Sequence, residues 1–358
     1  MTRNMSVASP IELQRLLQLT ARVGSDPLLT QASTGNSSIK IDGVLWMKAS
    51  GKWMADATRE DILIPLDWLE ITGDCLQQNV NPAERYPGAS VETAMHAVLP
   101  HSVVLHLHCV NTVAWAVRAD APVQLQRLLD GLRWQWIPYV ASGLPLAHAL
   151  NKALNAHPDT DMFILGNHGL VIGGEDCRAI DNLLAEIERR LAIHPRVAHP
   201  ADYTALMEIC QDSPWDLPDD DDLHALGTDA ASHSILSGGL LYPCQTIFSN
   251  ATTLELFQAI PYSDLNQRQS RYHDRPFLIV EGRGVVVGRD MTPAELAMVS
   301  GLAQVVQRID PSAPLRYLTE TEVATSSRLI AGHYRDLANE RVNGVPINQP
   351  LENAGTYR

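Results

Sequence analysis

Apolar residues recur every three or four positions in several stretches of the chain, a spacing that places them on one face of a helix. The first such stretch covers residues 10–24. Ser9 can cap this helix, Pro10 suits its first position, and Glu12 stands at the capping-box distance from Ser9. Further helices are predicted at 90–99, 144–156, 176–192 and 293–309, and around Leu125, Leu128, Leu129 and Leu132.

Short apolar runs bounded by turn residues predict β-strands between these helices. Residues 38–48 are typical of a hairpin, with Asp42 and Gly43 at its turn. Further strands are predicted at 61–65, 102–110, 161–165, 170–172, 277–281 and 284–288. Because strands alternate with helices along the chain, the sequence predicts a layered α/β fold.

The composition changes at residues 211–222 (QDSPWDLPDDDD), which contain two prolines and four consecutive aspartates. We interpret this stretch as a loop or linker, with its acidic run a solvated face rather than a metal site. The predicted organisation is a catalytic domain at 1–210, an acidic linker at 211–230, a smaller α/β domain at 231–345 and a loosely held tail at 346–358.

One sequence pattern occurs twice. Residues 163–173 read FILGNHGLVIG, and residues 278–288, 115 positions further on, read LIVEGRGVVVG. Arg283 of the second copy stands where His168 stands in the first. The pattern indicates either a degenerate repeat that has lost a functional residue or the ordinary similarity of α/β units.

The overall charge limits the classes of partner. The 358 residues carry a formal net charge of −14, with an isoelectric point near 5.3. This argues against nucleic-acid binding, which relies on clustered Lys and Arg. The five cysteines form no CxxC pair, and no signal-like or membrane-spanning apolar run is present. We therefore expect a soluble cytoplasmic protein with reduced thiols and no membrane partner.

Three histidines are the strongest chemical signal. His106 and His108 lie two positions apart in the predicted strand 102–110, so their side chains point to one face while apolar neighbours fill the other. His168 lies between Gly166 and Gly169 in a tight loop between two apolar strands. Three imidazoles with an open position are the arrangement of a catalytic zinc site.

Glu92 lies near the start of the helix at 90–99, capped by Ser90, where the helix dipole favours a carboxylate, and it is either a surface cap or a functional group. His96 lies on the same helical face and either orients Glu92 or is a core histidine. Hydroxyl-rich or N–H-rich turns that could hold an anion occur at 35–38, 50–52 and 89–90.

Taken together, these blocks resemble the class II aldolase/adducin family over residues 10–195. The blocks are GNSSIK (35–40), KASGK (48–52), ASVETAMH (89–96), VLHLHC (104–109), IPYV (137–140) and LGNHGLVIGG (165–174). The subgroup most similar is the aldolase portion of bifunctional rhamnulose-1-phosphate aldolase/alcohol dehydrogenase proteins. The chain contains no GxGxxG after a strand, so we do not expect nicotinamide binding.

The resemblance implies the following fold and residue roles. The fold would be a three-layer α/β/α domain around a mainly antiparallel sheet, followed by a smaller C-terminal α/β domain that contributes to assembly or covers the site. The metal ligands would be His106, His108 and His168, with Glu92 as acid/base. The positions that hold the substrate phosphate would be Gly35, Asn36, Ser50, Gly51 and Ser90.

Tyr139 and Arg283 are further candidate site residues, and the chain departs from the family pattern at Ala89. Tyr139 is a candidate for the acid that some family members use on the aldehyde oxygen. Arg283 either meets a substrate anion or is a surface arginine. Ala89 stands where family members often carry the first serine of a pair, which removes one expected phosphate hydrogen bond.

The implied reaction is a reversible retro-aldol cleavage of a sugar phosphate or related keto-sugar through a metal-stabilised enediolate. The ion would be zinc, with manganese or cobalt as alternatives, and the protein a homo-oligomer such as a tetramer. Decarboxylase, epimerase and dehydratase relatives use the same site, so the histidines do not separate these reactions. An alternative of another class is a non-catalytic adducin-like binding module, although adducin heads lack the metal histidines.

Overall fold

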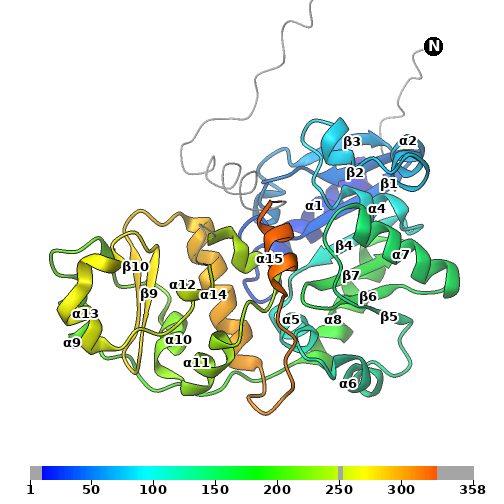
Figure 1. Ribbon diagram of the computed structural model, residues 1–358. Coiled ribbons are helices and arrows are strands. Elements are labelled where there is room, and N and C mark those ends of the chain that lie inside the picture. The colour runs from blue at the N-terminus through cyan, green and yellow to red at the C-terminus, as the bar shows by residue number, and fades with distance from the viewer. Residues whose placement is uncertain (1–9, 249–252, 329–358) are drawn as a thin grey trace, which may run out of the picture.

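The computed structural model describes residues 10–248 and 253–328, which form a larger and a smaller unit (Figure 1). Ser9, the tail at 346–358 and the expected domain end at 345 lie outside the described residues. None of the described helices combines the length and the apolar character that crossing a membrane would need.

A seven-stranded sheet in the order β3-β2-β1-β4-β7-β6-β5 forms the centre of the larger unit. Among its pairs, β5 and β6 run parallel and the others antiparallel, so the prediction of a mainly antiparallel sheet is confirmed. Asp42 and Gly43 have positive φ angles of 50° and 82°, as a two-residue hairpin turn requires. The strands are β1 (Asn36–Ile41), β2 (Val44–Lys48), β3 (Leu63–Asp67), β4 (Val103–Leu107), β5 (Trp134–Ile137), β6 (Met162–Leu165) and β7 (Gly169–Gly174).

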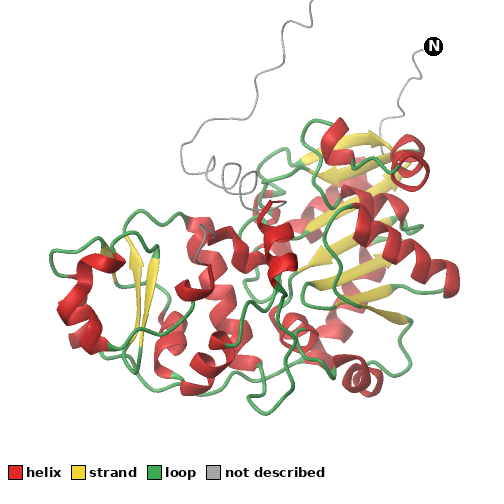
Figure 2. Cartoon of the chain, in the orientation of Figure 1, coloured by secondary structure: helices red, strands yellow, loops and turns green. Residues whose placement is uncertain are grey.

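Helices cover both faces of this sheet, which confirms the three-layer α/β/α prediction (Figure 2). Alternate residues of β4 point to opposite faces: Leu105 packs with one helical layer and Val104 with the other. The first layer contains α1 (Pro10–Gly24), α5 (Val110–Ala116), α6 (Ala121–Leu128) and α8 (Cys177–Leu191). The second contains α2 (Trp68–Gly73), α4 (Thr93–Val98) and α7 (Leu144–Ala156). Short helical turns complete the unit: η1 (Met54–Asp56), η2 (Asp74–Gln78) and α3 (Pro82–Arg85).

Helix α5 was missed by the sequence pattern. The predicted strand at 102–110 ends at Leu107, and a helix begins at Val110, whose N–H donates to the carbonyl of Leu28 at 2.7 Å. Because nearly every residue of α5 is buried, it shows no amphipathic alternation. A short apolar run of this kind does not distinguish a strand from a buried helix.

The smaller unit is built on a three-stranded sheet in the order β8-β10-β9. Its strands are β8 (Trp215–Asp216), β9 (Phe277–Val280) and β10 (Gly284–Gly288). Its helices are α9 (Tyr203–Cys210), α10 (Ala225–Thr228), α11 (Ala230–Ser237), α12 (Thr253–Leu256), α13 (Tyr262–Arg268), α14 (Pro293–Arg308) and α15 (Glu320–Ser326), with turns η3 (Asp221–His224), η4 (Pro243–Phe248) and η5 (Gln269–Tyr272).

The description of residues 211–230 as a linker is corrected by the structure. Trp215 is fully buried in β8 and pairs with Gly288 of β10, so this stretch belongs to the smaller sheet. The acidic run is ordered because Asp220 caps η3, its carboxylate accepting from the N–H of Asp222 at 3.0 Å. The four aspartates are exposed, as predicted for a solvated face, but the stretch contains a short strand and a capped helical turn and is therefore part of the smaller unit.

A common apolar core joins the two units. Val110 and Val113 of α5 pack in one cluster with Leu302 and Val306 of α14. Gly301 of α14 lies so close to the larger unit that an added Cβ would be 2.4 Å from Cγ of Gln31. The smaller unit is therefore held against the end of β4 from which α5 starts.

The repeated sequence pattern is also a repeated backbone pattern. In the first copy Leu165 pairs with Gly169, and in the second Val280 pairs with Gly284 at the equivalent register. The residue before His168 and the residue before Arg283 both have positive φ, 52° at Asn167 and 68° at Gly282. Their N–H groups donate to the carbonyls of Ala116 in α5 and Gly227 in α10, at 2.9 and 2.8 Å.

Candidate metal centre

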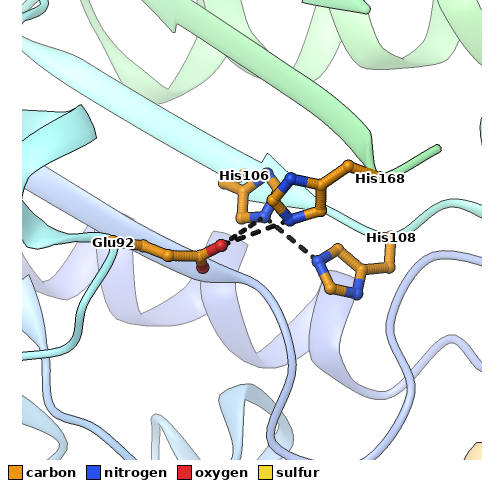
Figure 3. Close-up of side chains that lie close together, drawn as sticks. All are labelled: Glu92, His106, His108 and His168. Atoms are coloured by element: carbon orange, nitrogen blue, oxygen red, sulfur yellow. Dashed lines mark hydrogen bonds and ion pairs between the residues drawn. The ribbon is translucent and has the colours of Figure 1, made fainter. Parts of the chain in front are cut away.

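The pairing of β4 with β7 brings the three histidines together (Figure 3). His106 lies in β4 opposite Val171, and His108 follows one residue after the strand ends. His168 precedes β7 in the β6–β7 loop, so it lies beside the same end of β4. The predicted strand face is correct for His106, since Leu105 and Leu107 fill the opposite apolar face.

The imidazoles are buried and converge on one point. The ring centroids are 4.9 Å apart for His106 and His108, 4.9 Å for His106 and His168, and 5.1 Å for His108 and His168. One nitrogen from each ring and one carboxylate oxygen of Glu92 all lie within 4.8 Å of one another. Nitrogen and oxygen donors at this separation suit a first-row divalent ion.

The hydrogen bonds behind the rings fit a metal ion between them. Nδ1 of His106 lies 2.9 Å from the carbonyl oxygen of Leu170, and because a carbonyl only accepts, Nδ1 carries the hydrogen. Nε2 of His106 therefore presents a lone pair, and it lies 3.1 Å from Nε2 of His108. Burial lowers the pKa of His108 and His168, which favours the neutral form that binds metal.

The loop that presents His168 leaves no room for larger residues. An added Cβ at Gly169 would lie 2.4 Å from the carbonyl oxygen of Leu107. Asn167, in the left-handed conformation, donates from its carboxamide to the carbonyls of Leu241 and Arg316 at 2.8 and 2.7 Å. Because both of those residues follow the larger unit in the chain, the C-terminal part fixes the loop that carries His168.

Glu92 faces the histidines with one oxygen and the β1 strand with the other. Oε1 lies 3.2 Å from Nε2 of His168 and 3.5 Å from Nε2 of His106, while Oε2 accepts from the carboxamide of Asn36 at 2.8 Å. Burial acts to raise the pKa of Glu92, but the imidazoles of His106 and His168 outweigh it and hold the pKa well below its usual value. Glu92 immediately precedes α4, whereas the sequence placed it inside the first turn.

His96 is both a core residue and linked to Glu92. Its Nε2 lies 2.5 Å from Oδ1 of Asn36, and its Nδ1 lies 2.8 Å from Oγ of Ser38. Since the Asn36 amide nitrogen donates to Glu92, its oxygen accepts from His96, and Nδ1 of His96 accepts from Ser38. This hydrogen-bonded chain fixes the orientation of the Glu92 carboxylate.

With this geometry in view, residues 14–194 match the model of the class II aldolase and adducin N-terminal domain, which covers half of the chain. The chain belongs to the class II aldolase/adducin family. Among curated proteins it is similar to the uncharacterized oxidoreductase YuxG of Bacillus subtilis (strain 168), with 25% identity over 191 residues, 46% of this chain and 27% of that protein. The chain thus corresponds to about a quarter of that relative's length.

Two solved structures are also similar to this chain. A class II aldolase domain from Thermoplasma acidophilum shares 22% identity, covers 53% of this chain and 97% of its own, and has a TM-score of 0.43. An L-fuculose-1-phosphate aldolase from Thermus thermophilus shares 21% identity, covers 49% of this chain and 92% of its own, and has a TM-score of 0.34. The placement of this chain in the class II aldolase/adducin family rests on the family model, and the rhamnulose-1-phosphate subgroup stays a prediction.

A pocket opens beside the histidines, and all five predicted phosphate positions of this class II aldolase/adducin chain line it. They are Gly35, Asn36, Ser50, Gly51 and Ser90. Gly35 needs its small size, because at φ 67° an added Cβ would lie 2.8 Å from the carbonyl oxygen of His106. The Asn36 carboxamide donates to Glu92 and accepts from His96, and these two contacts fix its orientation beside the pocket.

Several lining residues were not predicted. Ser142 donates to Oε1 of Glu92 at 3.4 Å, and Lys48 lies at the end of β2 within a block that the sequence had marked only for Ser50 and Gly51. The smaller unit contributes a largely apolar wall that consists of Pro243, Cys244, Ile247 and Met298. The smaller unit thus borders the pocket, and no local signal in the sequence identified these residues.

Cys244 also contacts His108, one of the candidate metal ligands. Its Sγ lies 3.1 Å from Nδ1 of His108, the ring nitrogen opposite the one that faces His106. Burial raises the pKa of Cys244, so the thiol stays protonated. A second contact of this kind orients a ligating imidazole.

Tyr139 and Arg283 are not part of the pocket lining. The hydroxyl of Tyr139 lies 3.0 Å from Oγ of Ser326 in α15, and its ring lies under Arg316. Arg283 forms an ion pair with Asp202 in the smaller unit. The geometry favours the surface interpretation of Arg283 and gives Tyr139 a contact between the units.

Proposed function

We propose that this chain is a divalent-metal-dependent aldolase that performs reversible retro-aldol cleavage of a sugar phosphate or related keto-sugar. The observation that carries the proposal is the convergence of three buried imidazoles and one carboxylate in the pocket of a class II aldolase/adducin family member. The substrate class, the reaction and the oligomeric state are all proposed here. We expect a homo-oligomer, such as the tetramer common in the family, and a cytoplasmic location.

His106, His108 and His168 would hold the ion, and their geometry supports this role. The Nε2 atoms of His106 and His108 lie 3.1 Å apart, and a cation between them would take a lone pair from each ring when both rings carry their hydrogen on Nδ1. When bound, the ion supplies a Lewis acid for a substrate oxygen. Zinc suits three nitrogen ligands with an open position, and manganese or cobalt are alternatives.

Glu92 would hold the proton that moves during the reaction. In the cleavage direction Glu92 would accept the proton that the substrate hydroxyl loses as the carbon–carbon bond breaks, and its Oε1 would then deliver that proton to the carbon left with the electron pair. Asn36 and Ser142 hold the carboxylate in place for both directions. The low pKa of Glu92 favours the charged form that accepts a proton.

Metal analysis and a cleavage screen test the proposal. We expect about one divalent ion per chain in the wild type, as three ligands with an open position imply, and loss of the ion in His168→Ala. Ketose 1-phosphates should then release a three-carbon fragment. Metal without cleavage would favour the decarboxylase, epimerase or dehydratase alternatives. A wild-type chain without metal, even after reconstitution, would contradict the proposal and favour an adducin-like binding module.

A further inference from the structure

Asn167 is the residue through which the smaller unit holds the loop of His168. It is fully buried and directly precedes this candidate ligand. Its carboxamide nitrogen donates to the carbonyl oxygens of Leu241 and Arg316 at 2.8 and 2.7 Å, and its carboxamide oxygen accepts from Nη1 of Arg316 at 3.1 Å. All three contacts involve the smaller unit, and Arg316 makes two of them.

Arg316 also contacts three other segments at the boundary between the two units. It lies in the connection between α14 and α15, and its backbone N–H donates to the carbonyl of Val117, directly after α5, at 2.8 Å. Its Nη2 donates at 2.6 Å to Oε1 of Glu322, which belongs to the capping box of α15. Its guanidinium carbon lies 5.1 Å from the ring centroid of Tyr139, in the β5–α7 loop. One side chain thus joins α15 to two loops of the larger unit.

Both loops that the Arg316 side chain contacts carry groups of the candidate metal centre. The β6–β7 loop carries His168. The β5–α7 loop carries Ser142, whose hydroxyl donates to Oε1 of Glu92 at 3.4 Å. A metal site requires its ligands to be held within about 0.5 Å of their working geometry by the packing and hydrogen bonds behind them. Arg316 is placed to give this support from the side of the smaller unit.

We propose that Arg316 is a positioning residue for the metal centre, which acts by holding Asn167 and thereby the imidazole of His168. The smaller unit then sets the affinity for the ion without supplying a ligand. Groups behind a metal ligand tune metal affinity in this way, because they fix the direction in which the ligand presents its lone pair. The inference rests on the proposed function for the presence of a divalent ion, but it does not depend on which reaction follows.

Arg118 provides a matched control for Arg316. Its guanidinium carbon lies 4.7 Å from the ring centroid of Trp115, and its Nη2 pairs with Asp120 at 2.8 Å. Arg316 has the same two kinds of partner, an aromatic ring and a carboxylate, and Asn167 in addition. Arg118→Met and Arg316→Met therefore each lose a ring contact and an ion pair, whereas only Arg316→Met also loses the hydrogen bond to Asn167.

Competition with a chromophoric chelator measures zinc affinity on the intact chain, and the visible absorption of the cobalt-loaded protein reports ligand geometry. We expect Arg316→Met to weaken zinc binding by about tenfold, the low end for groups behind a metal ligand, and to shift the cobalt bands. Arg118→Met should match the wild type in both measurements. Arg316→Lys keeps a donor for the oxygen of Asn167 and should recover part of the affinity. Urea unfolding of the metal-free variants should show similar losses of stability for both methionine substitutions.

A double-mutant cycle tests the route through Asn167. Asn167→Gly tolerates the left-handed conformation and removes the carboxamide, so Arg316→Met should cost no further zinc affinity in that background. Three outcomes would overturn the inference and leave the proposed function intact: unchanged zinc affinity in Arg316→Met, an equal loss in Arg118→Met, or a full additional loss in the Asn167→Gly background. A wild type that binds no divalent ion would contradict the inference and the proposed function together.

Discussion

The β6–β7 loop of the larger unit and the β9–β10 loop of the smaller unit share a backbone and differ in chemistry. Both join strands paired at the same register, and both turn through a left-handed residue, Asn167 or Gly282. In both, that residue donates its N–H to the carbonyl of a residue in a helix, α5 or α10. The loops then present His168 in one case and Arg283 in the other.

The neighbouring strands extend the comparison. β8 pairs with β10 as β4 pairs with β7, since Trp215 lies opposite Gly288 and Val104 opposite Gly173. Counted along these strands, Leu217 occupies the place of His106. Instead of three converging imidazoles, the second loop has one neighbouring histidine, His224, which accepts from the N–H of Val285 at 3.1 Å, and an ion pair between Arg283 and Asp202. The backbone thus provides the place for a site, but the side chains that converge there decide whether a metal can bind.

The largest difference between the two loops should appear when the residue that distinguishes each loop, His168 or Arg283, is replaced by alanine. We expect His168→Ala to lose the metal ion and to reduce turnover to background. Mutation of even a hydrogen-bond partner of a metal ligand typically lowers metal affinity or activity about 10–100-fold, and His168 is a proposed ligand itself. Arg283→Ala removes a partly exposed ion pair and should leave metal content and turnover unchanged. Metal analysis and the cleavage assay check both variants. Equal effects of the two substitutions would contradict the assigned difference between the loops.

Glu92 separates acid/base chemistry from metal binding in the larger unit. Glu92→Gln keeps the shape and removes the charge, so we expect turnover to fall roughly 100-fold or more while the metal ion is retained. A strong loss of metal would instead make Glu92 a ligand, which its position 3.2 Å from His168 permits. Metal content and the turnover number, measured on the same preparation, distinguish these results.

The sequence could identify the three candidate metal ligands because the features that mark them are local. Strand alternation set the direction of His106, and two glycines marked the tight loop of His168. The hairpin at Asp42 and the helices α1 and α7 followed from turn chemistry and periodicity in the same way. Such features depend on neighbours in sequence, so the sequence predicts them.

The missed features depend on contacts between distant segments. Cys244 reaches His108 across 136 positions, and Lys48 became a pocket residue because β2 ends beside Ser33. Helix α5 is buried between the sheet and α8 of its own unit and α14 of the smaller unit, which follows it in the chain. Asp220, taken as part of a linker, caps η3. Neither spacing nor composition carries this information, because the packing of the smaller unit on the larger one determines it.

Cys244 connects the two units, because through it the smaller unit contacts His108, a proposed metal ligand. Cys244→Ala removes the partner of Nδ1 of His108, so we expect metal affinity to fall by about tenfold, the low end for such second contacts. Cys210→Ala, in α9 and away from the histidines, is the matched control. Competition with a chelator measures both affinities. Unchanged affinity in Cys244→Ala would show that the thiol only fills space.

Lys48 is expected to affect folding stability rather than metal binding, and with the opposite sign. The smaller sheet has three strands among the described residues, and none matches β2, which holds Lys48 in the pocket wall. Burial lowers its pKa from 10.5 to about 8, so the folded state disfavours the charged form that the unfolded chain retains. At neutral pH this costs the metal-free protein about 3 kcal/mol, and Lys48→Met should raise the free energy of unfolding by up to that amount.

The pH dependence identifies the cause of this gain. Because the folded pKa of Lys48 is below the unfolded one, the cost is complete below about pH 8 and disappears as the pH rises towards 10.5. The advantage of Lys48→Met over wild type should therefore shrink across that window, as urea unfolding at several pH values would measure. An advantage that stays constant with pH would point to packing instead of charge.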